Sequence, residues 1–92
     1  MAEPNVVTVN GHDITIDADA CESWEFFELV CEIGKEFDQT KVPAAFQLIE
    51  LCTGIGKDEF IELCREDGKR SASWRVVLES IGTVLAAAVP KN

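Results

Sequence analysis

The chain contains a single histidine, His12, and its four cysteines include no Cys-x-x-Cys pair. Zinc sites are built from closely spaced cysteine and histidine ligands, so the sequence offers no zinc geometry. A serine nucleophile needs a histidine base that an acid orients, whereas His12 stands beside a turn signal. Gly54-x-Gly56 lacks the third glycine of a phosphate-binding loop. We therefore expect a non-enzymatic protein without a cofactor, a metal or catalytic residues.

Long apolar runs and basic residues are also scarce. No apolar run reaches the roughly 20 residues that a bilayer-spanning helix needs. The first forty residues contain ten acids and one base, Lys35, and so hold the whole excess behind the net charge of −9. Such an acidic surface repels nucleic acid and anionic lipid and favours a basic or mixed-charge protein partner. We expect a soluble, cytoplasmic protein that binds neither nucleic acid nor membranes.

Two β-branched runs, at 6–9 and 12–16, flank the dipeptide Asn10-Gly11. Asn-Gly suits both positive-φ positions of a type I′ turn, so the pattern predicts a β-hairpin over about 6–16. The register places Val7, Val9, Ile14 and Ile16 on one face, and Thr8, Asp13 and Thr15 on the other. A lone hairpin is marginal in water, so its apolar face needs a helix to cover it.

Four helices are predicted after the hairpin, at about 20–37, 43–53, 57–66 and 72–89. Pro43 suits the first turn of the second helix and Gly54 its left-handed C-terminal cap. Composition and length fit one domain, 1–92. The predicted fold class is α+β, mainly α, with an N-terminal β-hairpin followed by a small four-helix bundle.

The acids before the first helix have two interpretations. Asp17, Asp19 and Glu22 weakly suggest a calcium loop, but Cys21 stands where an EF-hand loop needs an oxygen ligand. Helix capping explains the same acids, with Asp19 as the N-cap and Ser23 as an alternative. We prefer capping.

The first helix has an apolar face and an acidic one. The residues predicted to face the core are Trp24, Phe27, Val30, Cys31, Gly34 and Phe37, with Phe26 and Ile33 beside them. Trp24 and Trp74 each stand near a helix start, where a tryptophan can stack on bases, anchor a partner or anchor the core. We prefer core anchoring, because both fall on the predicted inward face. Outside lies an acidic ridge of Glu25, Glu28, Glu32 and Glu36. This ridge is either a solvated face or one side of a partner-binding surface.

The fourth helix has no charged residue between 80 and 90. Its predicted core face is Trp74, Val77, Leu78, Ile81, Val84, Leu85 and Ala88. A second face of small, uncharged residues comprises Val76, Ser80, Thr83 and Ala87. That face predicts a contact surface for a helical protein client or for a second copy of the chain, which would make a homo-oligomer. Packing of this segment entirely within its own domain remains the alternative.

The cysteines, Cys21, Cys31, Cys52 and Cys64, all fall within predicted helices. A free thiol in a helix behaves as a small apolar side chain. We expect buried, reduced thiols in preference to disulfides or metal ligands.

The order of these features is also informative. The hairpin runs Val-Thr-Val-Asn-Gly-His-Asp-Ile-Thr-Ile-Asp, and is followed by Ser-Trp-Glu-Phe-Phe-Glu-Leu at 23–29 and Pro-Ala-Ala-Phe-Gln-Leu-Ile-Glu-Leu at 43–51. Lys-Asp-Glu-Phe at 57–60 and Asp-Gly-Lys at 67–69 complete the pattern. Over nearly its whole length the chain resembles the tail assembly chaperones of long-tailed bacteriophages and prophages, chiefly those of Gram-positive hosts.

The resemblance implies a function without catalysis. Such chaperones bind the long, mostly helical tape measure protein in the host cytoplasm, keep it soluble, and leave as tail tube protein polymerises, so they are absent from the mature virion. A longer frameshifted form is common among them, and Pro90-Lys91-Asn92 permits a slippery codon run. The family's motifs define no binding residues and do not lead us to expect the four cysteines.

The competing interpretation is an acidic helical adaptor or inhibitor of another protein, including a DNA mimic whose glutamates imitate phosphates. Under either interpretation the surface chemistry selects the same partner-binding candidates. These are Glu25, Glu28, Glu32, Glu36, Val76, Ser80, Thr83 and Ala87.

Overall fold

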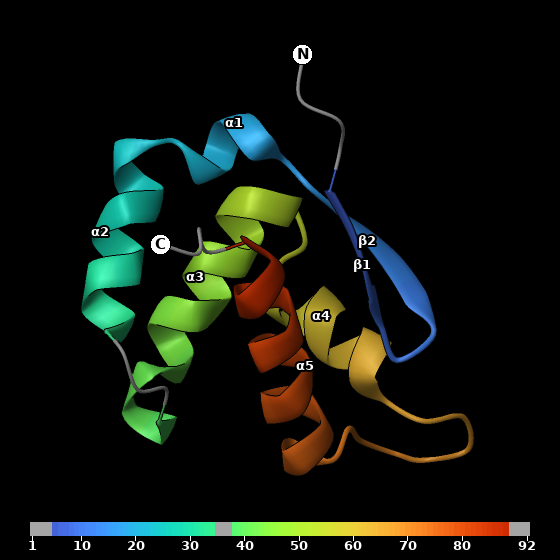
Figure 1. Ribbon diagram of the computed structural model, residues 1–92. Helices are drawn as coiled ribbons and strands as arrows, with labels where there is room; N and C mark the ends of the chain where they lie inside the picture. The colour runs from blue at the N-terminus through green and yellow to red at the C-terminus, as the bar shows by residue number, and fades with distance from the viewer. Residues whose placement is uncertain (1–4, 35–37, 89–92) are drawn as a thin grey trace.

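A computed structural model of the chain describes residues 5–34 and 38–88. It shows an α+β fold that is mainly helical, as predicted, with an N-terminal hairpin followed by helices (Figure 1). The elements are β1 (Asn5–Val9), β2 (His12–Ile16), α1 (Ala18–Cys21), α2 (Trp24–Ile33), the 3-10 turn η1 (Gln39–Lys41), α3 (Val42–Thr53), α4 (Lys57–Cys64) and α5 (Trp74–Ala88). Helix α3 occupies the centre, with α2 on one side and α4 and the hairpin on the other (Figure 1).

The predicted hairpin is confirmed in its turn type, its strand register and the face on which each side chain lies. Asn10 and Gly11 have φ of 50° and 82°, the positive values that a type I′ turn requires. Val9 pairs with His12, and Val7 with Ile14. On the apolar face Val9, Ile14 and Ile16 are buried and Val7 is partly buried, whereas Thr8, Asp13 and Thr15 are exposed. The Thr8 hydroxyl donates to Asp13 Oδ1 at 2.8 Å on the exposed face.

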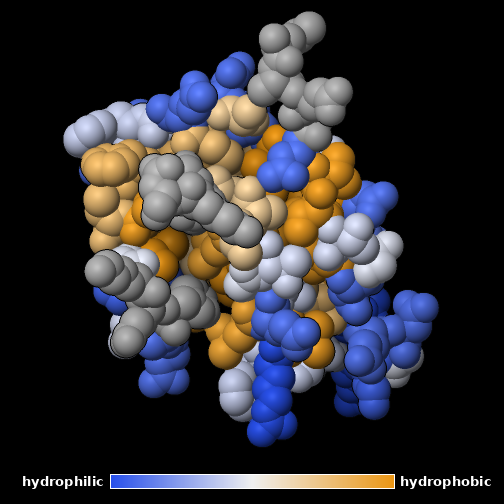
Figure 2. Space-filling model, in the orientation of Figure 1, coloured by the Kyte–Doolittle hydropathy of each residue, from blue (hydrophilic) through white to orange (hydrophobic). Residues whose placement is uncertain are grey.

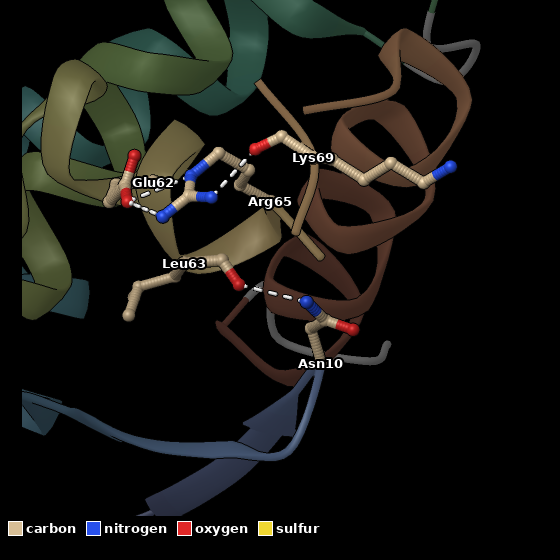
Figure 3. Close-up of polar contacts among 5 residues, drawn as sticks. All are labelled: Asn10, Glu62, Leu63, Arg65 and Lys69. Atoms are coloured by element: carbon tan, nitrogen blue, oxygen red, sulfur yellow. Dashed lines mark hydrogen bonds and ion pairs between the residues drawn. The ribbon is translucent and has the colours of Figure 1, made fainter. Parts of the chain in front are cut away.

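Both ends of the hairpin are hydrogen-bonded to distant helices. At the turn, Asn10 Nδ2 donates to the Leu63 carbonyl of α4 at 2.9 Å (Figure 3). At the other end, Asn5 Nδ2 donates to the Ala87 carbonyl of α5 at 2.9 Å. Arg65, which follows α4, donates to Glu62 Oε1 and to the Lys69 carbonyl, and so fixes the loop beside the turn (Figure 3). The hairpin therefore lies against α3 and α5, which cover its apolar face.

The predicted first helix, 20–37, is wrong in its extent, because the chain forms two helices there. Asp17 caps α1, since its carboxylate accepts from the backbone N–H groups of Asp19 and Ala20. Ser23 has an extended backbone that interrupts the helix, and its hydroxyl accepts from the Phe26 N–H at 3.2 Å to cap α2. The alternative cap, Ser23, is thus confirmed and Asp19 is not a cap. The predicted residues Glu36 and Phe37 lie outside the described residues.

Replacing the α2 cap should destabilise the domain measurably. Ser23→Ala leaves an N-terminal N–H of a ten-residue helix without its partner, and we expect a loss of about 1 kcal/mol in the free energy of unfolding. Ser23→Asp restores an acceptor and should recover most of the loss. Urea denaturation measures both variants, and equal stability of wild type and Ser23→Ala would show that the cap contributes nothing.

The core is built around α3, as the scarcity of polar residues in 43–53 predicts. Six of its residues are buried: Ala44, Ala45, Phe46, Leu48, Ile49 and Cys52. Phe60 of α4 packs edge-on against Phe46, with ring centroids 6.1 Å apart. Ile81 and Val84 of α5 are fully buried on another side. Gly54 ends α3 with φ of 79°, the left-handed cap that its position indicates.

The helices that the structure describes are short. The longest described helix, α5, has 15 residues. Within 5–34 and 38–88, no helix has the combined length and apolar character that a membrane span requires.

Candidate partner-binding surface

Helix α2 exposes two large aromatic side chains. Trp24 is 67 % and Phe27 54 % exposed, and their ring centroids lie 5.4 Å apart. Cys31, one turn further along, is also exposed. We call Trp24, Phe27 and Cys31 the aromatic stripe. Apolar residues come to the surface over α2, next to hydrophilic ones (Figure 2).

The predicted orientation of α2 is therefore wrong for Trp24, Phe27 and Cys31, whereas Val30 packs inward as predicted. Phe26 and Ile33 are buried and Leu29 and Val30 partly buried, whereas the predicted core residues of the aromatic stripe face outward. The helix carries apolar residues around more of its circumference than its main neighbour, α3, can cover. Spacing alone could not choose between the two apolar sides. The prediction that Trp24 and Trp74 anchor the core is wrong as well, since Trp74 is 66 % exposed.

The described part of the acidic ridge, Glu25, Glu28 and Glu32, lies beside the aromatic stripe. Glu25, Glu28 and Glu32 are exposed and follow the same spacing as Trp24, Phe27 and Cys31, one residue later. The two rows therefore run in parallel along α2. No described cation forms an ion pair with these three carboxylates, since the one described salt bridge joins Arg65 and Glu62. Lys41 Nζ lies nearby but donates to the backbone carbonyl of Glu32, at 3.0 Å.

The four candidates on α5 do not form the open face that the sequence suggested. Ser80 is 7 % exposed, and Val76 and Ala87 are partly buried against the core. Thr83 alone is exposed, and its hydroxyl donates to the Glu79 carbonyl at 3.1 Å. The open-face prediction is wrong for Ser80, because α5 packs against α3, α4 and β1. The alternative, packing within the domain, describes most of this face.

The cysteines differ widely in exposure. All four are free thiols, with Cys52 and Cys64 buried as predicted, Cys21 partly buried and Cys31 exposed against prediction. Burial, with a smaller contribution from the neighbouring Cys21, raises the pKa of the Cys52 thiol to about 12. Burial also raises the pKa of Cys64, partly offset by a hydrogen bond from the Ser80 side chain.

These differences predict the order in which the thiols react. The thiolate is the nucleophile, so under native conditions iodoacetamide should modify exposed Cys31 at least about tenfold faster than Cys52. Mass spectrometry of quenched time points measures both rates, and Cys31→Ser should remove the fast phase. Equal rates at Cys31 and Cys52 would contradict the buried position of Cys52.

The acids before α2 and the pocket beside α3 give no support for a metal site. Asp17 uses its carboxylate to cap α1, so one of these acids does cap a helix, although the predicted cap was Asp19. In the part of the chain that the structure describes, no three histidine, cysteine or acidic side chains group closely enough to hold a metal ion. A shallow pocket is lined by Val42, Phe46, Glu50 and Lys57 among others, and it contains neither a cysteine nor a histidine. We therefore take the exposed face of α2 as the candidate surface for binding a partner.

No protein-family model, curated protein or solved structure matches this chain. Its function must be inferred from its own surface and from the order of its sequence features. Of the eight partner-binding candidates, three glutamates lie together on α2, beside two aromatic residues that were expected in the core. The sequence signal for these aromatics was present, since Phe26, Leu29, Val30 and Ile33 form a second apolar arc with complete helical spacing.

Proposed function

We propose that this chain is a non-enzymatic tail assembly chaperone that binds the tape measure protein during tail morphogenesis in the cytoplasm of the bacterial host. The resemblance in the order of sequence features supports the assignment to this family. The structural observation that carries the proposal is the exposed aromatic stripe beside an acidic ridge on α2. Exposed apolar surface rimmed by polar residues is typical of protein interaction sites.

The charge of the chain supports the same function. A chaperone that masks an apolar client needs apolar surface for contact and a net charge far from zero to keep the complex dispersed. The chain has both, with a net charge of −9 and two large aromatic side chains more than half exposed on one helix. Neither feature requires a reacting group.

Co-expression tests this function directly. The tape measure protein of the same phage or prophage should be mostly insoluble alone, should become soluble with this chain, and should co-purify with it. Total protein in both cultures is the control for expression level. A tape measure protein that stays insoluble with and without this chain would contradict the proposal.

One observation favours the second candidate, an acidic adaptor or inhibitor that imitates DNA. Glu25, Glu28 and Glu32 form a row of exposed carboxylates. Gene order separates the two functions, because a chaperone gene should lie between those for tail tube and tape measure proteins. An inhibitor gene should lie among early or regulatory genes.

Of the sides of α5, only the exposed one is open to a second copy of the chain, so we restrict the proposal of self-association to that side. Val76 and Ala87 pack partly against the core, so glutamate at either position would disturb the fold as well as a contact. Thr83→Glu is the cleaner variant, because Thr83 is exposed. If α5 joins two copies, sedimentation should show a wild-type dimer that this substitution weakens, whereas a monomeric wild type at high concentration would remove the proposal.

A further inference from the structure

Trp24 and Phe27 are exposed side by side on α2, whereas Trp74, the third exposed aromatic residue described, lies on α5 and the other described phenylalanines are buried. Phe26, Phe46 and Phe60 are 2 %, 8 % and 0 % exposed. Aromatic side chains carry large apolar areas, and their exposure in contact with each other leaves a continuous apolar strip exposed to water. A partner that covers this strip would bury apolar surface that the domain alone leaves exposed to water.

The arrangement of the strip indicates the shape of that partner. Trp24, Phe27 and Cys31 span about two helical turns, roughly 10 Å, along one side of α2. A straight strip of this length on a convex helix matches a second helix lying alongside, whose side chains at helical spacing fit between those of α2. Val30, which is partly buried, borders the strip on the side away from the glutamates.

The charges beside the strip indicate the chemistry of the partner. Glu25, Glu28 and Glu32 line one side of the aromatic stripe, and residues 5–34 contain no lysine or arginine. A partner helix with lysine or arginine along one edge of its apolar seam would place those cations against the three carboxylates. A second copy of α2 would instead bring its own glutamates close, and an anionic membrane would be repelled.

We propose that the aromatic stripe and the three described glutamates beside it form a docking site for a basic amphipathic helix of another protein. The apolar seam of that helix lies on Trp24 and Phe27, and its cations lie against Glu25, Glu28 and Glu32. That this helix belongs to a tape measure protein rests on the proposed function. The docking chemistry does not depend on that identification.

A synthetic peptide provides the probe. We would label a 20-residue helical peptide with a leucine seam and lysines along one edge of it, and compare it with two control peptides. One replaces the lysines with glutamates, and the other has the same composition in an order without a seam. Fluorescence anisotropy at physiological salt should show binding of the basic seamed peptide at least about tenfold tighter than either control.

Substitutions in the chain locate the site. Trp24→Ala and Phe27→Ala should each weaken binding of the basic peptide about tenfold or more. Glu28→Lys should also weaken binding, and its loss of affinity should be larger at low salt than at high salt. Trp74→Ala is the matched control, because Trp74 is 66 % exposed but lies on α5, and it should leave the affinity unchanged. Circular dichroism of each variant checks that the fold is retained, as expected for exposed positions.

Three results would overturn the docking site. These are equal binding of the basic and acidic peptides, unchanged affinity in both Trp24→Ala and Phe27→Ala, and a loss of affinity in Trp74→Ala equal to that in the α2 variants.

Co-expression with the Trp24→Ala/Phe27→Ala double variant separates this site from the proposed function. If the double variant solubilises the tape measure protein as well as wild type does, the function stands and the site fails. If the wild-type chain does not solubilise the tape measure protein while the peptide binds at α2, the site stands and the function fails.

Discussion

Phe60→Ala is expected to lower the free energy of unfolding by about 3–5 kcal/mol. The Phe60 side chain is fully buried and packs edge-on against Phe46 at an interplanar angle of 74°. It is one of only two buried residues that α4 contributes, the other being Cys64. Truncation would leave a cavity where α4 meets α3, and the short helix has little other burial to hold it in place.

Such a loss is large for a domain of this size, whose total stability is typically about 5–15 kcal/mol. The melting temperature should fall by more than about 10 °C. Phe27→Ala is the matched control, because it removes the same atoms from a side chain that is 54 % exposed, and should cost below about 1 kcal/mol. Urea and thermal unfolding measure both variants. Equal losses in the two variants would mean that Phe27, too, is a core residue.

Ser80→Glu is expected to cost about 3 kcal/mol or more at pH 8. Ser80 is 7 % exposed on α5. A carboxylate there would be taken out of water without a described cation beside it. Thr83→Glu, one turn along the same helix, places the same charge at an exposed position. Its cost, mainly repulsion from Glu79, should stay below about 1 kcal/mol.

The penalty of Ser80→Glu should also depend on pH. Burial raises the pKa of a carboxyl, whereas in the unfolded chain its pKa stays near about 4.3. Above that value the unfolded state increasingly releases the proton that the folded state retains, so the penalty grows as pH rises through the folded pKa. We expect the loss relative to wild type to be larger at pH 8 than at pH 5. A small, pH-independent loss would show that position 80 reaches water, as the open-face prediction held.

The features that the sequence predicted well are local ones. Asn10-Gly11 defines a turn type, and the turn defines the register of the strands on either side. Pro43 and Gly54 likewise mark the limits of α3, whose near absence of polar residues requires a central position. In each case the information lies within a few residues of the structure that it determines.

Apart from the break at Ser23, which is local, the errors concern contacts between distant elements. Which side of α2 faces inward depends on α3, because α2 offers two apolar sides and spacing does not rank them. Whether Ser80 is open depends on α3, α4 and β1, which pack around α5. The candidate surface was therefore half predicted: its glutamates were identified from the sequence, while Trp24 and Phe27 were assigned to the core.

The hydrogen bond from Asn5 to the Ala87 carbonyl joins residues 82 positions apart, and β1 packs on α5 around it. Of the described elements, the ribosome makes β1 first and α5 last. At about 5–20 residues per second, several seconds pass between them, during which Val9 and Ile14 have no α5 to cover them. A two-stranded hairpin is marginally stable by itself, so the nascent chain should remain open until α5 has emerged. Folding of this domain should therefore wait until α5 has left the ribosome.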